Sequence, residues 1–455
     1  MIWFHLAVAI IFIIIGSRLG GVGVGLAGGA GCIVLVATGL HTKVAEGCIV
    51  LVATGLHTKV AEDIPWTVIG IIMTVICAIA ALQLAGGMDY LVHLAEVMLR
   101  KHPNQINYLA PLTTFLLSLL CGTGHTAYSV LPVIVEVAKE HKIRPSRPLS
   151  IAVVASQVAV ASSPISAATL ALVGVLEPLG VGYLEILAVT IPTTFIGCAV
   201  GAVVASRQGK DLIDDPIYQE REAKGLVSHN AAVADTGWRP KRTAIPSLVA
   251  FLVALVVVVG YATVSSEEVG VLTKPPMTSS AAIMLIMLTT AMIICMMSRE
   301  DVKQLTTQTT FRAGMSAAIC ILGLAWLGNM FVNNYMDVLT HAGASILHSA
   351  PWFLSVILYL AAPLMFSHAA TTVAFMPVVA KIGLSPMVML ACYPAVANYY
   401  LLPNYPTTVA AMEMDDTGST RVGRIVLNHP FVLPGTVSIA VTVLLGAFWA
   451  PIVLG

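Results

Sequence analysis

The chain alternates between long apolar runs and short polar connections, and this pattern predicts a protein built of membrane-spanning helices. Apolar runs of about twenty residues are long enough to cross the hydrocarbon core of a bilayer as an α-helix. The first run, MIWFHLAVAIIFIIIG, lacks the basic n-region and the small-residue cleavage site of a signal peptide. We therefore expect it to be the first span of an all-α polytopic membrane protein.

Composition supports this expectation. The chain has 455 residues, of which 58% are hydrophobic and only 10% are charged, whereas about a quarter of the residues of soluble domains are charged. The formal net charge is zero, which gives no indication of a nucleic-acid partner. The cysteines all lie in apolar segments without metal-type spacing, so we expect buried free thiols at positions 32, 48, 77, 121, 198, 295, 320 and 392.

The distribution of Lys and Arg predicts the orientation of the spans. The positive-inside rule places basic connections in the cytoplasm, and these are Arg18, Arg100 with Lys101, 139–147, 207–242, 299–312, and Arg421 with Arg424. The connections poor in Lys and Arg are then expected outside, near 41–65, 177–183, 264–279 and 333–350. This assignment puts both ends of the chain in the periplasm.

Two apolar segments do not fit as simple spans. The pieces 107–121 and 125–138 meet at CGTGHTAYS, yet both of their flanks are basic. A re-entrant helical hairpin that enters and leaves on the cytoplasmic side resolves this conflict. A second hairpin is expected over 351–380, where two pieces meet at MFSHAATT, and its flanks place it on the opposite face.

The two halves of the chain repeat the same order of elements with inverted topology. Residues 1–205 and 246–455 each predict three spans, a hairpin, an interrupted span and a final span. The interruptions lie at SSPIS (162–166) and NYYLLPNYP (398–406), and residues 206–245 form a cytoplasmic linker. Inverted repeats with broken helices are characteristic of secondary transporters.

The hairpin tips and the helix breaks are the candidate binding elements. Non-helical backbone at membrane depth is tolerated where it lines a cavity or is buried in protein, and the free N–H groups of a half-helix favour an anion. These elements contain no Lys or Arg, so hydroxyl, amide and imidazole groups would have to hold the anion, which suits a carboxylate. The candidates are Thr123, His125, Thr126, Ser129, Ser162, Ser163, Ser166, Thr169, Ser367, His368, Thr371, Thr372, Asn398, Asn404, Thr407 and Thr408.

Alternatives remain open at this stage. Ser and Thr in membrane helices also bond their own helix backbone or pack between helices, and each histidine could cap a half-helix instead of binding a ligand or a proton. The sequence has no P-loop, HExxH or GxSxG motif and no metal-spaced Cys/His set. We therefore expect no enzyme activity, no bound metal and no cofactor.

Several strings resemble the anaerobic C4-dicarboxylate transporter family (Dcu) over essentially the whole chain. They include GTGHTAYSVLPVI (122–134), DDPIYQEREAKGLV (214–227), FRAGMSAAICILGLAWLG (311–328) and MDDTGSTRVGRIVLNHPF (414–431). The resemblance implies an elevator-type carrier in a bacterial inner membrane. It would exchange fumarate, malate or aspartate for succinate in anaerobic metabolism.

The resemblance leaves other modes of action open. Uptake coupled to Na⁺ or H⁺ is one alternative, and a transporter-like co-sensor that acts with a membrane sensor kinase is another. A homodimer is also left open. The chain departs from the family pattern at His368, where the family commonly has Gln, and at Asn404, where it commonly has Thr. The first departure argues against an obligatory proton role for His368.

The 16-residue string GCIVLVATGLHTKVAE occurs twice in succession, at 31–46 and 47–62. Its apolar part is about ten residues long, too short to span a bilayer. As a continuous helix, sixteen residues would rotate the helix face by about 160° and turn the second copy away from the packing surface of the first. We expect the second copy to be an insertion on the outer side that leaves the core unchanged.

Overall fold

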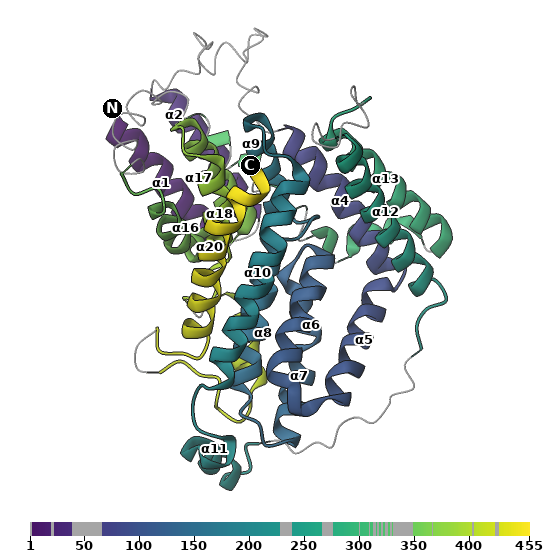
Figure 1. The fold of residues 1–455 in the computed structure, drawn as a ribbon, viewed down its shortest axis with the longest axis vertical. Coiled ribbons are helices and arrows are strands. Elements are labelled where there is room, and N and C mark those ends of the chain that lie inside the picture. The colour runs from purple at the N-terminus through teal and green to yellow at the C-terminus, as the bar shows by residue number, and fades with distance from the viewer. Residues whose placement is uncertain are drawn as a thin grey trace.

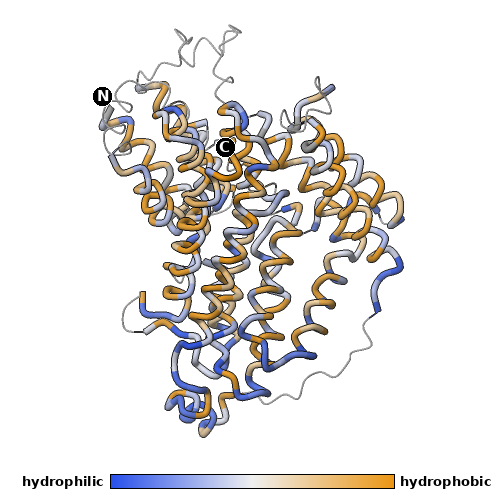
Figure 2. Tube along the Cα trace, viewed as in Figure 1, coloured by the Kyte–Doolittle hydropathy of each residue, from blue (hydrophilic) through white to orange (hydrophobic). Residues whose placement is uncertain are grey.

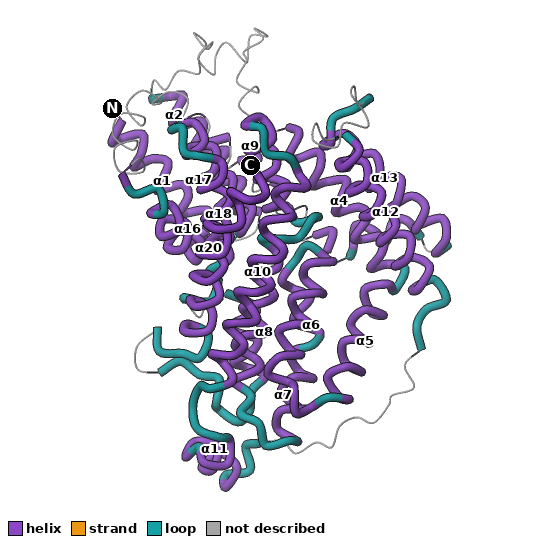
Figure 3. The backbone as a smooth tube through the Cα atoms, in the orientation of Figure 1, coloured by secondary structure: helices purple, strands orange, loops and turns teal. Residues whose placement is uncertain are grey.

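In a computed structural model of the chain, every described secondary-structure element is a helix (Figures 1 and 3). The structure describes residues 2–19, 22–38, 66–227, 239–265, 276–299, 301–308, single positions within 310–330, and 349–365, 367–402, 405–423 and 427–455. The second copy of the repeated string, 47–62, lies outside this part of the chain.

The first half forms its elements in the predicted order, ending in one long helix. These are α1 Ile2–Leu19, α2 Val22–Ala37, α4 Trp66–Leu84, α5 Gly87–Lys101, η2 Pro103–Gln105, α6 Ile106–Cys121, η3 Gly124–Ser129, α7 Leu131–Glu140, α8 Ser146–Val160, α9 Ala167–Leu176, η4 Glu177–Leu179 and α10 Tyr183–Ser206. The first hairpin is therefore α6 and α7 with the 3₁₀ turn η3 at its tip. The first broken span is α8 and α9.

The linker and the described part of the second half follow the same scheme, except that the third predicted span lies largely outside the described residues. Their elements are η5 Leu212–Asp214, α11 Pro216–Ala223, α12 Ala244–Val264, α13 Ser279–Ser298, η6 Val302–Thr307, α16 Phe353–Met365, α17 His368–Lys381, α18 Pro386–Cys392, η7 Tyr393–Ala397, α19 Pro406–Met414 and α20 Val432–Leu454. The second hairpin is α16 and α17. The second broken span is α18 with η7, followed by α19.

Helix lengths confirm the polytopic prediction. Among the described residues, Tyr183–Ser206, Ser280–Ser298 and Val432–Leu454 are long and apolar enough to cross a membrane singly, and Ile69–Leu84 with Gly87–Lys101, bent by 66°, counts as a fourth when the two helices are taken together as one span. The shorter apolar helices include pieces of the hairpins and broken spans. The all-α fold with two inverted repeats, each with a hairpin and a broken helix, is thus confirmed.

Polar residues gather at one end of the molecule. Helix α1 begins and α20 ends toward the upper end in Figure 1, whereas α11 lies at the lower end. The connections around α11 are the most hydrophilic part of the trace, and the helices above them are largely apolar (Figure 2). This matches the predicted separation of the charged linker from the spans.

The third span is bent near its end. An apolar run ends near residue 84, and a separate helix, α5, then continues to the predicted cytoplasmic residues Arg100 and Lys101. The break between α4 and α5 occurs at Gly86, whose φ of +84° is favourable for glycine. Because α5 carries Arg100, bonded to Glu96 and to Glu136 of α7, it packs as a polar-edged helix beside the first hairpin.

The cysteine prediction is confirmed for the described positions. Six cysteines are free thiols, of which Cys32, Cys121, Cys198 and Cys392 are buried and Cys77 and Cys295 are partly buried. Positions 48 and 320 lie outside the described residues.

Two small-residue positions allow α10 and α20 to approach closely. A Cβ atom on Gly197 would lie 2.0 Å from the Thr442 Oγ1 atom and 2.6 Å from the Ser438 carbonyl oxygen. One turn on, a Cβ on Gly201 would lie 2.0 Å from the Ser438 Oγ atom. Glycines spaced by four residues let membrane helices pack backbone to backbone.

We expect the substitution Gly197→Val to force α10 and α20 apart and to lower the unfolding temperature of the purified protein. Overpacking a close contact costs about 1–3 kcal/mol. Gly260→Val is the matched control, because Gly260 also lies within a helix but a Cβ added there would meet no atom within 4 Å. Equal unfolding temperatures for the two variants would contradict the close α10–α20 contact.

Candidate functional site

The first broken span packs directly on the first hairpin. The Ser163 hydroxyl donates to the Leu119 carbonyl of α6 at 2.6 Å. Gly122, at the end of α6, has a φ of +68°, and a Cβ there would lie 3.1 Å from the Ile165 carbonyl oxygen. The hairpin tip and the helix break of the first repeat therefore form one unit.

Local hydrogen bonds shape the first hairpin tip. The Thr123 Oγ1 atom accepts from the His125 backbone N–H at 3.3 Å and lies 3.0 Å from the His125 Nδ1 atom. The Thr126 hydroxyl, which is buried, donates to the Thr123 carbonyl at 3.1 Å and contacts the Ser118 hydroxyl at 3.1 Å. His125 and Ser129 are exposed. The tip therefore has two exposed residues, His125 and Ser129, and a buried pair of hydroxyls, those of Ser118 and Thr126, that contact each other.

The four hydroxyls of the first break are buried and bonded within the protein. Ser166 caps α9, where its Oγ atom accepts from the Thr169 N–H at 3.1 Å and bonds the Thr169 hydroxyl at 3.0 Å. The Ser162 hydroxyl donates to the Ala159 carbonyl at 3.2 Å. The structure therefore gives Ser162, Ser163, Ser166 and Thr169 roles in shaping and capping the break.

The second hairpin tip repeats this capping. Ser367 caps α17 by accepting from the Ala370 N–H at 3.2 Å. The hydroxyls of Thr371 and Thr372 donate to backbone carbonyls one turn earlier, at 3.0 and 2.8 Å. His368 is buried, and its Nε2 atom lies 3.1 Å from the Gln157 backbone carbonyl oxygen of α8. This contact joins the second tip to the first broken span.

The second break lies against the same helix. The Thr407 hydroxyl accepts from the Gln157 side-chain Nε2 atom at 3.1 Å. Asn398 donates its amide to the Tyr359 carbonyl at 2.7 Å, and Thr408 donates to the Tyr399 carbonyl at 3.4 Å. Asn404 lies outside the described residues.

Gln157 is the common neighbour that the sequence analysis did not identify. Its side chain bonds Thr407 of the second break, its backbone carbonyl faces His368 of the second tip, and its amide covers Gly124 of the first tip. Since Gln157 lies one turn before the first break, it connects all four predicted elements. The available signal is that Gln157 is the single amide side chain in α8.

A series of neighbouring aromatic rings connects the two tips. The Tyr399 ring centroid lies 4.3 Å from that of His368 and 4.7 Å from that of Tyr405. The Tyr405 ring in turn lies 6.4 Å from the His125 ring. In the string NYYLLPNYP the prolines and asparagines predict the helix break, whereas nothing in the sequence pattern singles out the tyrosines.

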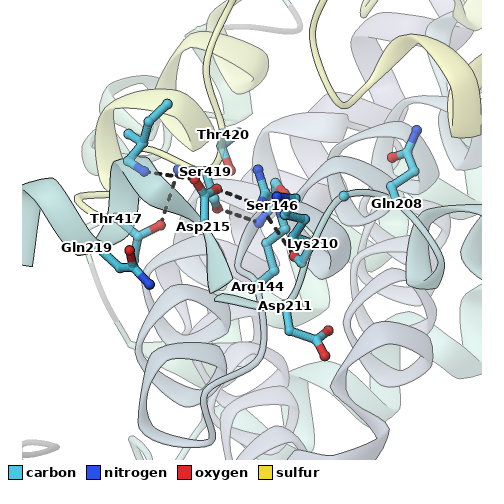
Figure 4. A network of polar contacts seen from close by, with 12 residues as sticks. Arg144, Ser146, Gln208, Lys210, Asp211, Asp215, Gln219, Thr417, Ser419 and Thr420 are labelled. Atoms are coloured by element: carbon cyan, nitrogen blue, oxygen red, sulfur yellow. Dashed lines mark hydrogen bonds and ion pairs between the residues drawn. The ribbon is translucent and has the colours of Figure 1, made fainter. Parts of the chain in front are cut away.

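A polar cluster on the linker side of the molecule holds the ends of these elements together (Figure 4). The Arg144 guanidinium pairs with the Asp215 carboxylate of the linker at 2.5 Å, and the Lys139 ammonium, at the end of α7, pairs with Asp416 at 2.8 Å. The Ser146 N–H donates to the Ser419 hydroxyl at 3.0 Å. These contacts therefore hold together the end of the first hairpin, the linker and the segment after α19.

Asp415 organises its own turn within this polar cluster. One carboxylate oxygen accepts from the Thr417 N–H at 3.0 Å and from the Thr417 hydroxyl at 2.5 Å. The other accepts from the Ser419 hydroxyl and the Thr420 N–H, both at 2.7 Å. All four hydrogen bonds come from donors of the same turn, so Asp415 stabilises this turn.

Comparison with known proteins agrees with this architecture. The family described as anaerobic C4-dicarboxylate membrane transporter matches residues 1–454. The C4-dicarboxylate transporter DcuA of Wolinella succinogenes is 47% identical over 100% of both chains, and DcuA of Escherichia coli (strain K12) is 42% identical over 98% of both. The solved YdaH transporter of Alcanivorax borkumensis has a similar fold, with a TM-score of 0.58 and 13% identity over 88% of this chain and 89% of that one. The chain belongs to the anaerobic C4-dicarboxylate transporter family, and it is a membrane transporter rather than an enzyme.

Proposed function

We propose that the chain is a secondary carrier that exchanges C4-dicarboxylates, with fumarate, malate or aspartate entering as succinate leaves. The observation that carries this proposal is the meeting of both hairpin tips and both helix breaks around Gln157. Relatives named C4-dicarboxylate transporters support the substrate class. The resemblance supports a bacterial inner membrane as the location, and the positive-inside pattern supports periplasmic ends.

The chemistry of the site suits an exchanged anion. Helices α9, α17 and α19 begin at the breaks and the second tip, and each N-terminus carries a partial positive charge. No Lys or Arg lies in the hairpin tips or the helix breaks, so a dicarboxylate would be held by dipoles, hydroxyls and amides and could leave readily.

Proteoliposomes containing the full chain test this proposal. We expect labelled fumarate to enter vesicles preloaded with succinate and not vesicles without internal dicarboxylate. Uptake into unloaded vesicles that requires an imposed Na⁺ or pH gradient would instead establish cation-coupled uptake. The absence of flux under all of these conditions would contradict the transporter proposal and favour a sensor role with a kinase partner.

A further inference from the structure

Gln157 presents a buried hydrogen-bond acceptor at the point where the four elements meet. The residue is 1% exposed. Its Oε1 atom has no hydrogen-bond partner within the described part of the chain. Buried polar groups are nearly always paired, and an unpaired one needs an explanation.

Neighbouring hydroxyls fix the direction of the amide. The Ser156 hydroxyl donates its single hydrogen to the Val153 carbonyl at 2.7 Å, so its oxygen can only accept a bond from Gln157. The Gln157 Nε2 atom donates to Ser156 at 3.3 Å and to Thr407 at 3.1 Å. Both amide hydrogens are used in this way, and the remaining group of the amide is the acceptor Oε1.

The backbone of the first tip makes room for this amide. A Cβ on Gly124 would lie 2.4 Å from the Gln157 Nε2 atom and 2.9 Å from Oε1. The His368 contact to the Gln157 carbonyl holds the same residue from the second tip. The acceptor is therefore held in place between two elements that the proposed function assigns to the substrate site.

We propose that the Gln157 Oε1 atom recognises the substituent on C2 of the dicarboxylate, by accepting a hydrogen bond from a 2-hydroxyl or 2-ammonium group. This inference rests on the proposed function. Ionised carboxylates only accept hydrogen bonds, so the two ends of the substrate cannot satisfy Oε1. Within the substrate class, malate and aspartate carry a donor at C2, whereas fumarate and succinate do not. A site built to bond such a group discriminates against analogues that lack it.

Competition between two ligands of similar size tests this assignment. Malate carries a hydroxyl at C2, and 2-methylsuccinate carries a methyl group in its place. In exchange of labelled fumarate by wild-type proteoliposomes, we expect malate to inhibit at least about tenfold better than 2-methylsuccinate, in keeping with a hydrogen bond to a buried acceptor. Equal inhibition by the two compounds would overturn the assignment without any variant.

The substitution Gln157→Met removes the acceptor and keeps most of the side-chain volume. We expect the ratio of the two inhibition constants to fall to about one, whatever the remaining fumarate rate. Ser150→Ala is the matched control, because Ser150 is a buried residue of the same helix whose hydroxyl donates to the Arg147 carbonyl, away from the tips and breaks.

The outcomes separate this inference from the proposed function. A wild-type protein that exchanges no dicarboxylate would defeat the proposed function. A protein that exchanges fumarate, but whose ratio is unchanged in Gln157→Met, would defeat only the role of Gln157. Elution as a single peak in detergent shows that each variant is folded. If Gln157→Met does not fold, the ratio of the malate and 2-methylsuccinate inhibition constants in the wild-type protein decides whether the acceptor recognises the C2 substituent.

Discussion

Replacing Arg144 with alanine is expected to destabilise the protein by about 3–5 kcal/mol, since it leaves the buried Asp215 carboxylate without its partner. The two side chains are 15% and 7% exposed and lie 2.5 Å apart. Arg144 also donates to the Lys210 carbonyl, so the linker would lose two of its contacts and remain attached through Arg147, which pairs with Asp211. The measurement is the thermal unfolding midpoint of the purified protein in detergent.

Two further variants give this prediction its control. In the double variant Arg144→Ala with Asp215→Asn, no charge is left unpaired and the helix-capping oxygen of residue 215 is kept, so part of the stability should return. Lys224→Ala breaks the Lys224–Glu220 pair on α11, in which the two side chains are 60% and 62% exposed, and should leave the midpoint unchanged. A midpoint for Arg144→Ala equal to that of Lys224→Ala would show that Asp215 does not depend on Arg144.

The positions of the hairpins and breaks were predictable because their causes are local. Gly122 ends α6 with a positive φ, Ser166 and Ser367 are N-caps, and Pro406 begins α19. Such residues interrupt helices through their own backbone preferences and cap bonds. The positive-inside rule then assigns those interruptions to hairpins of opposite entry.

The contacts of Gln157 were not predictable, because its partners are distant in sequence. Thr407 lies 250 residues away and His368 lies 211 residues away. Within α8 a glutamine has an acceptable helix propensity and no turn chemistry. Its importance arises only when the second repeat folds against the first.

The linker shows the same limit. Residues 206–245 mix acidic and basic side chains, which indicates a solvated connection, yet Asp215 and Arg221 bind partners far along the chain. The string DDTGST did contain a local cause, because an Asp followed by Thr and Ser favours a side-chain-bonded turn. Asp416 in the same turn pairs with Lys139 of the first hairpin, and no local rule predicts this contact.

The substitution Gly124→Ala is expected to reduce exchange by about tenfold to a hundredfold while the protein stays folded. The added Cβ would lie 2.4 Å from the Gln157 Nε2 atom, so the amide must move away from Thr407. An overpacking cost of about 1–3 kcal/mol that falls on the binding arrangement corresponds to this loss. Initial rates of fumarate–succinate exchange over a range of fumarate concentrations measure it.

Shortening the opposing side chain provides the decisive comparison. In Gly124→Ala combined with Gln157→Asn, the amide is withdrawn by one methylene, which relieves the clash with the new Cβ. If the two residues compete for the same space, the loss of exchange in the double variant should be smaller than the combined losses of Gly124→Ala and Gln157→Asn alone, a coupling that contacting residues show and distant ones do not. Ser150→Ala, at a buried position of α8 away from the tips and breaks, controls for a general effect of substitution. Strictly additive losses in the double variant would mean that Gly124 is required for another reason, and the close approach of the first tip to Gln157 would then not govern transport.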